Sequence, residues 1–398
     1  MDIFDKCLEF TKVEDYKERG IYPYFFPISE NYGPRVVMEG REIIMIGSNN
    51  YLGLTKDPRV QEAAIKAVEK FGTSCSGSRF LNGTYELHVE LEARLAKFVN
   101  KEAALMFSTG YQTNVGAIYT ILDKNSVVIT DKTNHACLFD GILLAKGTNP
   151  GMVMRRYKHN DMDDLERVIS TVDPELPKLI ITDGVFSMEG DIVKLPRLLR
   201  IAKTHRARVY VDDAHGMGVL GKTGRGTLEH FHAFDDVDLV TTTFSKSFAS
   251  LGGFVAGKAE VINYIKHFSR PLIFSAAIPP ANTAAVLKAL EIIESEPEIV
   301  HRLQQTGERM RREFTALGFD TGDSETPIIP ILVRDYDKTF AFWKALFEAG
   351  IYTNAVVSPA VPADRSLLRT SYMATHTDKD LDQVLDTFKK IGKQMGII

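Results

Sequence analysis

The stretch VYVDDAHGMG (209–218) decides the fold, because a run of apolar β-forming residues ends directly in acidic and imidazole side chains followed by glycines. Apolar runs without polar alternation are typical of strands buried on both faces of a sheet. Ligands of α/β sheets bind beyond the carboxyl ends of the strands, so Asp212 and His215 are expected to face such a crevice. A carboxylate there could hold a pyridine nitrogen protonated. Taken alone, the same residues could equally form a helix cap or a surface turn.

The sequence around this stretch alternates short apolar runs with helical patterns. The helical patterns lie near residues 58–71, 85–99, 161–171 and 195–204. The apolar runs are IIMI (43–46), VVIT (127–130), KLIIT (178–182), ARVYV (207–211) and DLVTTT (238–243). Strands separated by helices of this length predict βαβ units, and therefore an α/β fold with a mostly parallel central sheet.

The pattern changes after about residue 280. A helical pattern with a break at Pro297 covers 281–316, and it is followed by two apolar runs, 328–333 and 351–357, that alternate with helical segments. This part predicts a smaller C-terminal α+β domain. A length of 398 residues favours about two domains. We expect a large domain over 46–285, a small domain over 286–398, and an N-terminal segment, 1–45, that packs with the small domain.

Composition excludes several functional classes. The net charge is −4, from 48 basic and 52 acidic residues, which argues against nucleic acid as a partner. Cys7, Cys75 and Cys137 form no CxxC pair, so neither a disulfide framework nor a metal site is expected, and a cytoplasmic location fits. The charged first residues do not resemble a signal peptide. No apolar run reaches the ~18 residues of a membrane span, which leaves only peripheral membrane contact open.

The stretch TTTFSKSFASLGG (241–253) places Lys246 among hydroxyl side chains, just after an apolar run. A lysine that leaves bulk water near another cation can lose its proton and become a nucleophile, and an aldehyde cofactor would meet it as a Schiff base. The hydroxyls of Thr243 and Ser245 could bind a phosphate. An isolated Ser-Lys pair is more often an ordinary solvated lysine, so this motif needs support from the others.

The stretch MFSTGYQTN (106–114) joins an apolar run to a helical pattern at Gly110. A glycine there allows close backbone approach, and the N–H groups of the following turn form an anion site at the positive end of the helix. The stretch is not a P-loop, since no Gly-Lys-Ser/Thr follows, and alone it could be a plain capped turn.

Together, these three motifs resemble the fold type I pyridoxal phosphate (PLP) transferases, which are aspartate aminotransferase-like, and more narrowly the α-oxoamine synthase family. This family condenses an amino acid with an acyl-CoA and releases CO2. The resemblance covers residues from about 20 to 390. It is carried by SNNYLGL (48–54), GSRFLNGTYELHVELE (77–92), STGYQTN (108–114), DKTNHACLFDG (131–141), DGVFSMEGD (183–191), VDDAHGMGVLGKTGRG (211–226), TFSKS (243–247) and LLRTSYMATHT (367–377).

The resemblance implies a role for each matching residue. Lys246 would be the Schiff-base lysine and the proton-transfer base. Asp212 would pair with the pyridinium nitrogen, and His215 would bond the phenolic oxygen near Ser187. His135 would stack on the ring and touch the amino-acid carboxylate. The phosphate would lie at a group of residues from the other two motifs, Gly110, Tyr111, Thr243 and Ser245.

The resemblance also implies substrate and subunit contacts. Arg369 in LLRTS would bind the substrate carboxylate through its planar fork, although alone it could be a surface ion pair. Asn50 would contact the amino acid or the thioester. The family's active site lies at a dimer interface, so Ser275 and Ala276 would reach the phosphate of the neighbouring subunit in a homodimer.

The lysine context selects a branch of the family. Three branches usually carry Gly-Lys-Ala, namely 2-amino-3-ketobutyrate CoA ligase, 8-amino-7-oxononanoate synthase and 5-aminolevulinate synthase. This chain has Ser245-Lys246-Ser247, which resembles the bacterial serine palmitoyltransferase branch, as does the segment 356–369. That branch implies L-serine and a long-chain acyl-CoA such as palmitoyl-CoA as substrates, and 3-ketosphinganine, CoA and CO2 as products. Another α-oxoamine synthase, or more distantly a PLP aminotransferase, is the alternative.

Overall fold

The structure, a computed structural model, describes residues 2–398 and divides into two compact units. The large unit is Asn49–Gln305. The small unit joins the residues up to Ser48 with Thr306–Ile398, so it is built from both ends of the chain. The domain boundaries predicted from the sequence, after residue 45 and after residue 285, stay predictions.

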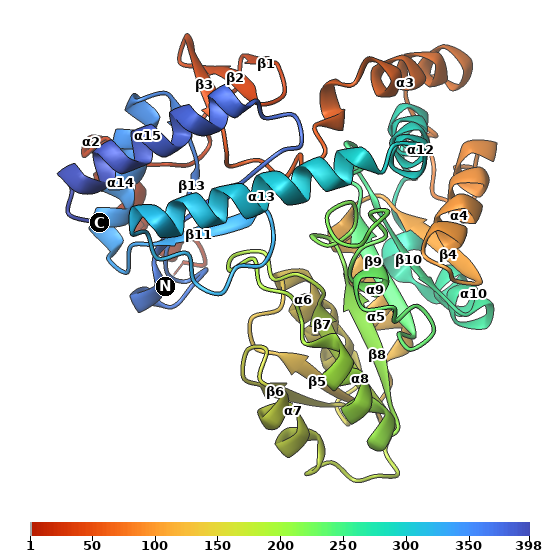
Figure 1. The fold of residues 1–398 in the computed structure, drawn as a ribbon. Coiled ribbons are helices and arrows are strands. Elements are labelled where there is room, and N and C mark those ends of the chain that lie inside the picture. Colours follow the sequence, from red (N-terminus) through yellow and green to blue (C-terminus); the bar gives the residue numbers. More distant parts are fainter. Residues whose placement is uncertain (1) are drawn as a thin grey trace. The chain divides into compact units, whose positions relative to one another are not determined.

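The large unit contains a seven-stranded sheet in the order β4-β10-β9-β8-β7-β5-β6 (Figure 1). Its strands are β4 (Ala103–Phe107), β5 (Val127–Asp131), β6 (Val153–Tyr157), β7 (Lys178–Asp183), β8 (Ala207–Asp212), β9 (Leu239–Thr243) and β10 (Gly253–Gly257). The strands from β6 to β9 pair in parallel, and β10 pairs antiparallel with both β9 and β4. The prediction of a mostly parallel sheet is therefore confirmed.

The central strands are continuous apolar runs in the sequence because both of their faces are buried. Every residue of β5 and β7 is buried, because helices cover the sheet. One core cluster joins strand residues Val128, Ile181 and Val255 to Ile118 and Leu138 of two helices. The helices of this unit are α3 (Pro58–Phe71), α4 (Glu86–Phe98), α5 (Gly110–Ile121), α6 (Ala136–Thr148), α7 (Met162–Ile169), α8 (Leu195–Thr204), α9 (Thr227–His230), α10 (Ala259–Phe268), α11 (Arg270–Ile273), α12 (Pro280–Ser295) and the start of α13 (Glu298–Leu317), with a 3-10 turn, η1 (Leu54–Lys56).

The chain direction in the parallel strands positions the site. A loop follows each of β5, β7, β8 and β9 at the same edge of the sheet, where the carboxyl ends of parallel strands meet. Side chains from distant parts of the sequence therefore converge at this edge. Among residues 2–398, no helix is both long enough and apolar enough to cross a membrane.

The small unit contains two small sheets. One has the order β1-β2-β3-β12 and the other β11-β14-β13. The first three residues of the run IIMI lie in β3 of this unit and not in the central sheet, so the grouping of this run with the parallel strands was wrong. β3 pairs antiparallel with β2 and parallel with β12. The elements are α1 (Asp5–Leu8), α2 (Lys12–Glu18), β1 (Glu30–Asn31), β2 (Arg35–Met38), β3 (Arg41–Met45), β11 (Ile328–Leu332), α14 (Tyr336–Glu348), β12 (Ile351–Tyr352), β13 (Asn354–Val356), η2 (Ala363–Arg365), β14 (Leu367–Ser371), α15 (Asp378–Gln394) and most of α13.

Candidate active site

A pocket of about 260 Å³ lies at the carboxyl edge of the large sheet. It collects nine of the residues predicted from the sequence, which come from four separate strand ends and the start of α5. These are Gly110, Tyr111, His135, Ser187, Asp212, His215, Thr243, Ser245 and Lys246. Their convergence is the geometry expected of a site built at the loops of an α/β sheet.

Asp212 is the last residue of β8, and its carboxylate is held from two sides. Asn114 Nδ2 donates to Asp212 Oδ2 at 2.7 Å, and the backbone N–H of Ala214 donates to Oδ1 at 3.0 Å. The Asn114 oxygen accepts hydrogen bonds from Tyr210 and Thr241. The orientation of Asp212 is therefore fixed by a hydrogen-bond network that joins β8, β9 and α5.

Lys246 lies in the tight link between β9 and β10. Phe244 and Phe248 on either side of it are fully buried, and the Ser250 N–H bonds to the Phe244 carbonyl at 3.0 Å. Buried aromatic residues on both sides fix the backbone of this loop, while Lys246 itself lines the pocket. The predicted role of Lys246 as the Schiff-base lysine stays a prediction.

The first turn of α5 approaches β9 closely. A Cβ atom placed on Gly110 would lie 2.5 Å from Thr243 Cβ and 2.7 Å from Thr243 Oγ1, so only glycine fits here. Thr109 caps the helix by accepting the Gln112 N–H at 3.0 Å. The Thr243 and Ser245 hydroxyls lie 2.8 Å apart beside this helix start. A helix N-terminus next to two hydroxyls is suited to binding a phosphate.

His135 caps α6 and is tied to the neighbouring strand. Its backbone N–H donates to Asp183 Oδ2 at 2.8 Å, and its Nδ1 accepts the Cys137 N–H at 3.2 Å. Burial lowers the pKa of His135; Asp212 opposes this shift and Lys246 adds to it. The ring is therefore neutral near pH 7, with its proton on Nε2, because Nδ1 accepts a hydrogen bond.

Two carboxylates lie side by side at this edge. Asp183 ends β7 and is the register partner of Asp212 on β8. Burial, and secondly the charge of Asp212, raise the pKa of Asp183 well above its ordinary value. Two adjacent buried carboxyl groups are unfavourable when both are charged, which adds to the raised pKa of Asp183.

The remaining predicted residues have distinct surroundings. His215 Nδ1 lies 2.7 Å from the Tyr51 hydroxyl, and both rings are buried. Tyr111 is half exposed and donates a hydrogen bond from its hydroxyl to Asp140; this bond, followed by burial, raises the pKa of Tyr111 to about 12. Ser187 lines the pocket from the loop after β7.

Four predicted residues do not line this pocket. Asn50 is buried, and its side chain donates to Thr55 Oγ1 at 2.8 Å. Ser275 and Ala276 border a separate small cavity, where Ser275 Oγ accepts from Gln112 Nε2 at 2.8 Å. Arg369 is buried on β14 of the small unit. Their roles stay predictions.

The pocket fits PLP on its own chemistry. One end offers a helix N-terminus with two hydroxyls for a phosphate, and the other offers a buried carboxylate for a protonated ring nitrogen. Lys246 and the neutral His135 ring line the same pocket. These groups match a phosphorylated pyridine aldehyde better than a purely anionic or purely apolar ligand.

Sequence reasoning did not single out several residues at this site. Asn114, Asp183 and Cys137 line the pocket, and Tyr51 contacts His215. Asn114 could have been found, because it lies four residues after Gly110 and so shares its helix face. Asp183 carries a similar signal, because it ends the apolar run of β7 as Asp212 ends that of β8.

Comparisons with known proteins agree with this geometry. The sequence model of the aminotransferase class I and II family matches residues 41–388. A serine palmitoyltransferase of Sphingobacterium spiritivorum is 47% identical over 393 residues, which are 99% of this chain and 97% of that protein. An 8-amino-7-oxononanoate synthase of Thermoanaerobacter pseudethanolicus is 42% identical over 97% of both chains. A solved structure of SPT with the PLP internal aldimine has a TM-score of 0.95 at 34% identity and covers 100% of both chains. This chain therefore belongs to the aminotransferase class I and II family, with the fold type I architecture of PLP-dependent transferases, and within it to the α-oxoamine synthases.

Proposed function

We propose that this chain is a PLP-dependent acyltransferase that condenses L-serine with a long-chain acyl-CoA. Palmitoyl-CoA is the expected donor, and the products are 3-ketosphinganine, CoA and CO2. The observation that carries the proposal is the pocket in which Lys246, Asp212, His135 and the N-terminus of α5 meet. The choice of serine and of a long acyl chain is supported by several relatives, 44–47% identical over the whole chain, that bear this name.

When bound, PLP supplies an aldehyde that links to amines and a ring that accepts negative charge from the substrate α-carbon. Asp212 would hold the proton of the ring nitrogen, because its carboxylate is buried and fixed by Asn114. Gly110, Tyr111, Thr243 and Ser245 would bind the phosphate. His215 and Ser187 would donate to the phenolic oxygen, and the neutral His135 ring would cover the face of the cofactor.

Lys246 moves the proton in this reaction. Its Nζ, freed when serine takes its place, would remove the proton from the serine Cα. The acyl group bonds to that Cα as the CoA thiolate leaves, the serine carboxylate departs as CO2, and Lys246 returns a proton to the same carbon. Arg369 would orient the serine carboxylate through a bidentate contact.

The assembly and location are further parts of the proposal. We expect a homodimer in which Ser275 and Ala276 reach the phosphate of the other subunit. The adjacent Phe274 is 75% exposed, which is unusual for a large apolar side chain and suits a subunit contact. The three cysteines are free, in keeping with a cytoplasmic protein.

A second candidate reaction is that of 8-amino-7-oxononanoate synthase, because a relative with that name is 42% identical. A turnover panel separates the two. Glycine, alanine and serine would each be tested with acetyl-, succinyl-, pimeloyl- and palmitoyl-CoA, and Lys246→Ala would be the control. We expect serine with palmitoyl-CoA to be at least tenfold faster than any other pair. Faster turnover of alanine with pimeloyl-CoA would overturn the proposal in favour of the second reaction.

A further inference from the structure

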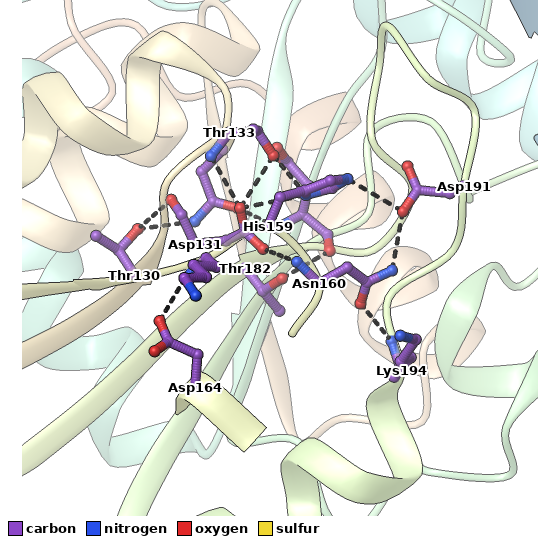
Figure 2. Close-up of polar contacts among 12 residues, drawn as sticks. Thr130, Asp131, Thr133, His159, Asn160, Asp164, Thr182, Asp191 and Lys194 are labelled. Carbon is purple, nitrogen blue, oxygen red and sulfur yellow. Dashed lines mark hydrogen bonds and ion pairs between the residues drawn. The ribbon is translucent and has the colours of Figure 1, made fainter. Parts of the chain in front are cut away.

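A largely buried ionic cluster lies at the carboxyl ends of β5 and β6 (Figure 2). His159 follows β6 and lies between two carboxylates. Its Nδ1 is 3.3 Å from Asp131 Oδ1, and its Nε2 is 3.3 Å from Asp191 Oδ2. Asp131 ends β5, and Asp191 belongs to the loop after β7. His159 itself is not a lining residue of the pocket.

The contacts define the charge of His159. Burial of the ring opposes a positive charge, but the hydrogen bonds to Asp131 and Asp191 outweigh it and raise the pKa of His159 to about 10. A neutral imidazole can donate from only one nitrogen, whereas both nitrogens here face carboxylates. His159 is therefore an imidazolium across the physiological pH range, and it bonds to both Asp131 and Asp191.

One side of the cluster leads to His135. Asp131 Oδ1 accepts hydrogen bonds from the backbone N–H and the hydroxyl of Thr133, at 2.8 and 2.9 Å. The same Thr133 hydroxyl lies 2.6 Å from His159 Nδ1. Thr133 is two residues before His135, so these bonds fix the turn that delivers the His135 ring to the pocket.

The other side leads to Ser187. The Phe186 N–H bonds to the Asp191 carbonyl at 3.0 Å, and the Phe186 ring meets the His159 ring edge-on with centroids 4.4 Å apart. Ser187 follows Phe186 directly. Asn160 reinforces the connection, because its N–H donates to Asp131 Oδ2 at 2.7 Å and its amide donates to Asp191 Oδ2 at 2.8 Å.

We propose that His159 is a positioning residue, which holds the loop of His135 and the loop of Ser187 in fixed relation through Asp131 and Asp191. The inference rests on the proposed function only for the roles of His135 and Ser187 in catalysis. The linkage between the two loops is a property of the protein itself, and it can be measured without substrates.

The first test is amide hydrogen exchange of the protein without cofactor. The variants are His159→Gln, which removes the charge, and Asp191→Asn, which alters only one end of the cluster. His230→Gln is the control, because His230 is exposed at the end of α9. We expect both test variants to exchange at least tenfold faster in residues 132–136 and also in 185–190, with β10 unchanged. Faster exchange confined to the segment that carries the substitution would overturn the linkage.

The second test separates positioning from mere structural support. We expect His159→Gln to raise the dissociation constant of PLP at least tenfold and to lower kcat with serine at least tenfold, with KM for palmitoyl-CoA changed less than twofold. The double variant His159→Gln/Asp191→Asn should have a PLP dissociation constant and a kcat no worse than those of the more impaired single variant. Unchanged PLP affinity and kcat, despite looser loops, would overturn the positioning role. If no substrate pair reacts, the proposed function fails, but the exchange and PLP titration still decide this inference.

Discussion

Asn114 Nδ2 lies 2.7 Å from Asp212 Oδ2, and the oxygen of the same amide accepts hydrogen bonds from Tyr210 and Thr241. Asn114 therefore uses both ends of its side chain to present the carboxylate that is expected to hold the ring nitrogen. A hydrogen bond to a charged group contributes about 1.5–3 kcal/mol, which corresponds to a rate effect of roughly 10–100-fold if it acts in the transition state.

We expect Asn114→Ala to slow removal of the serine α-proton by roughly 10–100-fold, because Asp212 loses its partner. Asp212→Asn should be slower still, since an amide cannot stabilise the pyridinium by charge. The measurement is α-proton exchange of serine in deuterated water, followed by NMR. Thr120→Val on the same helix is the control, as its hydroxyl bonds only to the Gly116 carbonyl in the described contacts. Exchange at the wild-type rate in Asn114→Ala would show that Asp212 needs no such support.

Lys246→Ala should abolish turnover and leave the fold intact. The reason is that the variant lacks both the amine that links to the cofactor and the base for the α-proton. Circular dichroism checks the fold, and borohydride reduction of the wild-type protein followed by peptide mapping checks the linkage. A pyridoxyl group found on another lysine would contradict the assignment.

Gly110→Ala should weaken PLP binding, because the added methyl group would lie 2.5 Å from Thr243 Cβ and push α5 away from β9. The backbone at Thr243 is within 3.2 Å of the same point, so a side-chain rotation cannot relieve the contact. We expect at least a tenfold higher dissociation constant in a fluorescence titration. Gly147→Ala is a matched control in α6, since a Cβ there meets nothing within 4 Å; it should stabilise the protein by up to about 1 kcal/mol.

Arg369→Ala should weaken the binding of serine far more than the binding of the acyl-CoA. A charge-assisted bidentate pair contributes about 1.5–3 kcal/mol, or roughly 10–100-fold in the binding constant. Arg369→Lys should rescue little, because an ammonium cannot form the planar fork. Serine titrations of the cofactor spectrum give the binding constant. Because Arg369 is buried between two partner strands, an equal loss for palmitoyl-CoA would indicate a structural defect instead.

The raised pKa of His159 predicts a pH-dependent stability. The folded protein holds this proton up to a pKa of about 10, whereas an unfolded histidine loses it near pH 6.5. Folding therefore binds a proton between these values, and the stability from His159 is complete below about pH 6.5 and is lost as the pH rises through 10. Urea unfolding of the wild type and of His159→Gln at pH 6, 8 and 10 measures the contribution of His159 to the free energy of unfolding. The difference in unfolding free energy should shrink steadily, and a constant difference would show that the ring is neutral.

The parts of the fold that the sequence predicted are those whose local pattern agrees with their tertiary setting. Helices α3 and α8 have the predicted limits, and β7 and β8 are continuous apolar runs because both of their faces are covered. The strands without a clear signal have other compositions. β6 (VMRRY) is an edge strand with two exposed arginines, and β10 (GFVAG) is bounded by glycines.

The site was predictable where side chains follow strand ends in sequence, as with Asp212 and Lys246. The sequence does not predict site residues whose role depends on a contact with a residue far away in the chain. Tyr51 is 164 residues from its partner His215, and Asn114 is 98 residues from Asp212. No local pattern indicates such pairs. The run IIMI shows another limit of local patterns. Its apolar character predicts a strand but does not reveal which of the two units that strand joins.

The small unit needs both ends of the chain, and this has a consequence for synthesis on the ribosome. β3 pairs with β12, whose residues are made about 300 residues later. At ~5–20 residues per second, the two strands are separated by about 15–60 s of translation. The Asn49–Gln305 unit is complete before then, so it can fold first while β2 and β3 wait with an unpaired apolar edge. During this interval the nascent chain is most exposed to aggregation, and chaperone binding is expected to concentrate there.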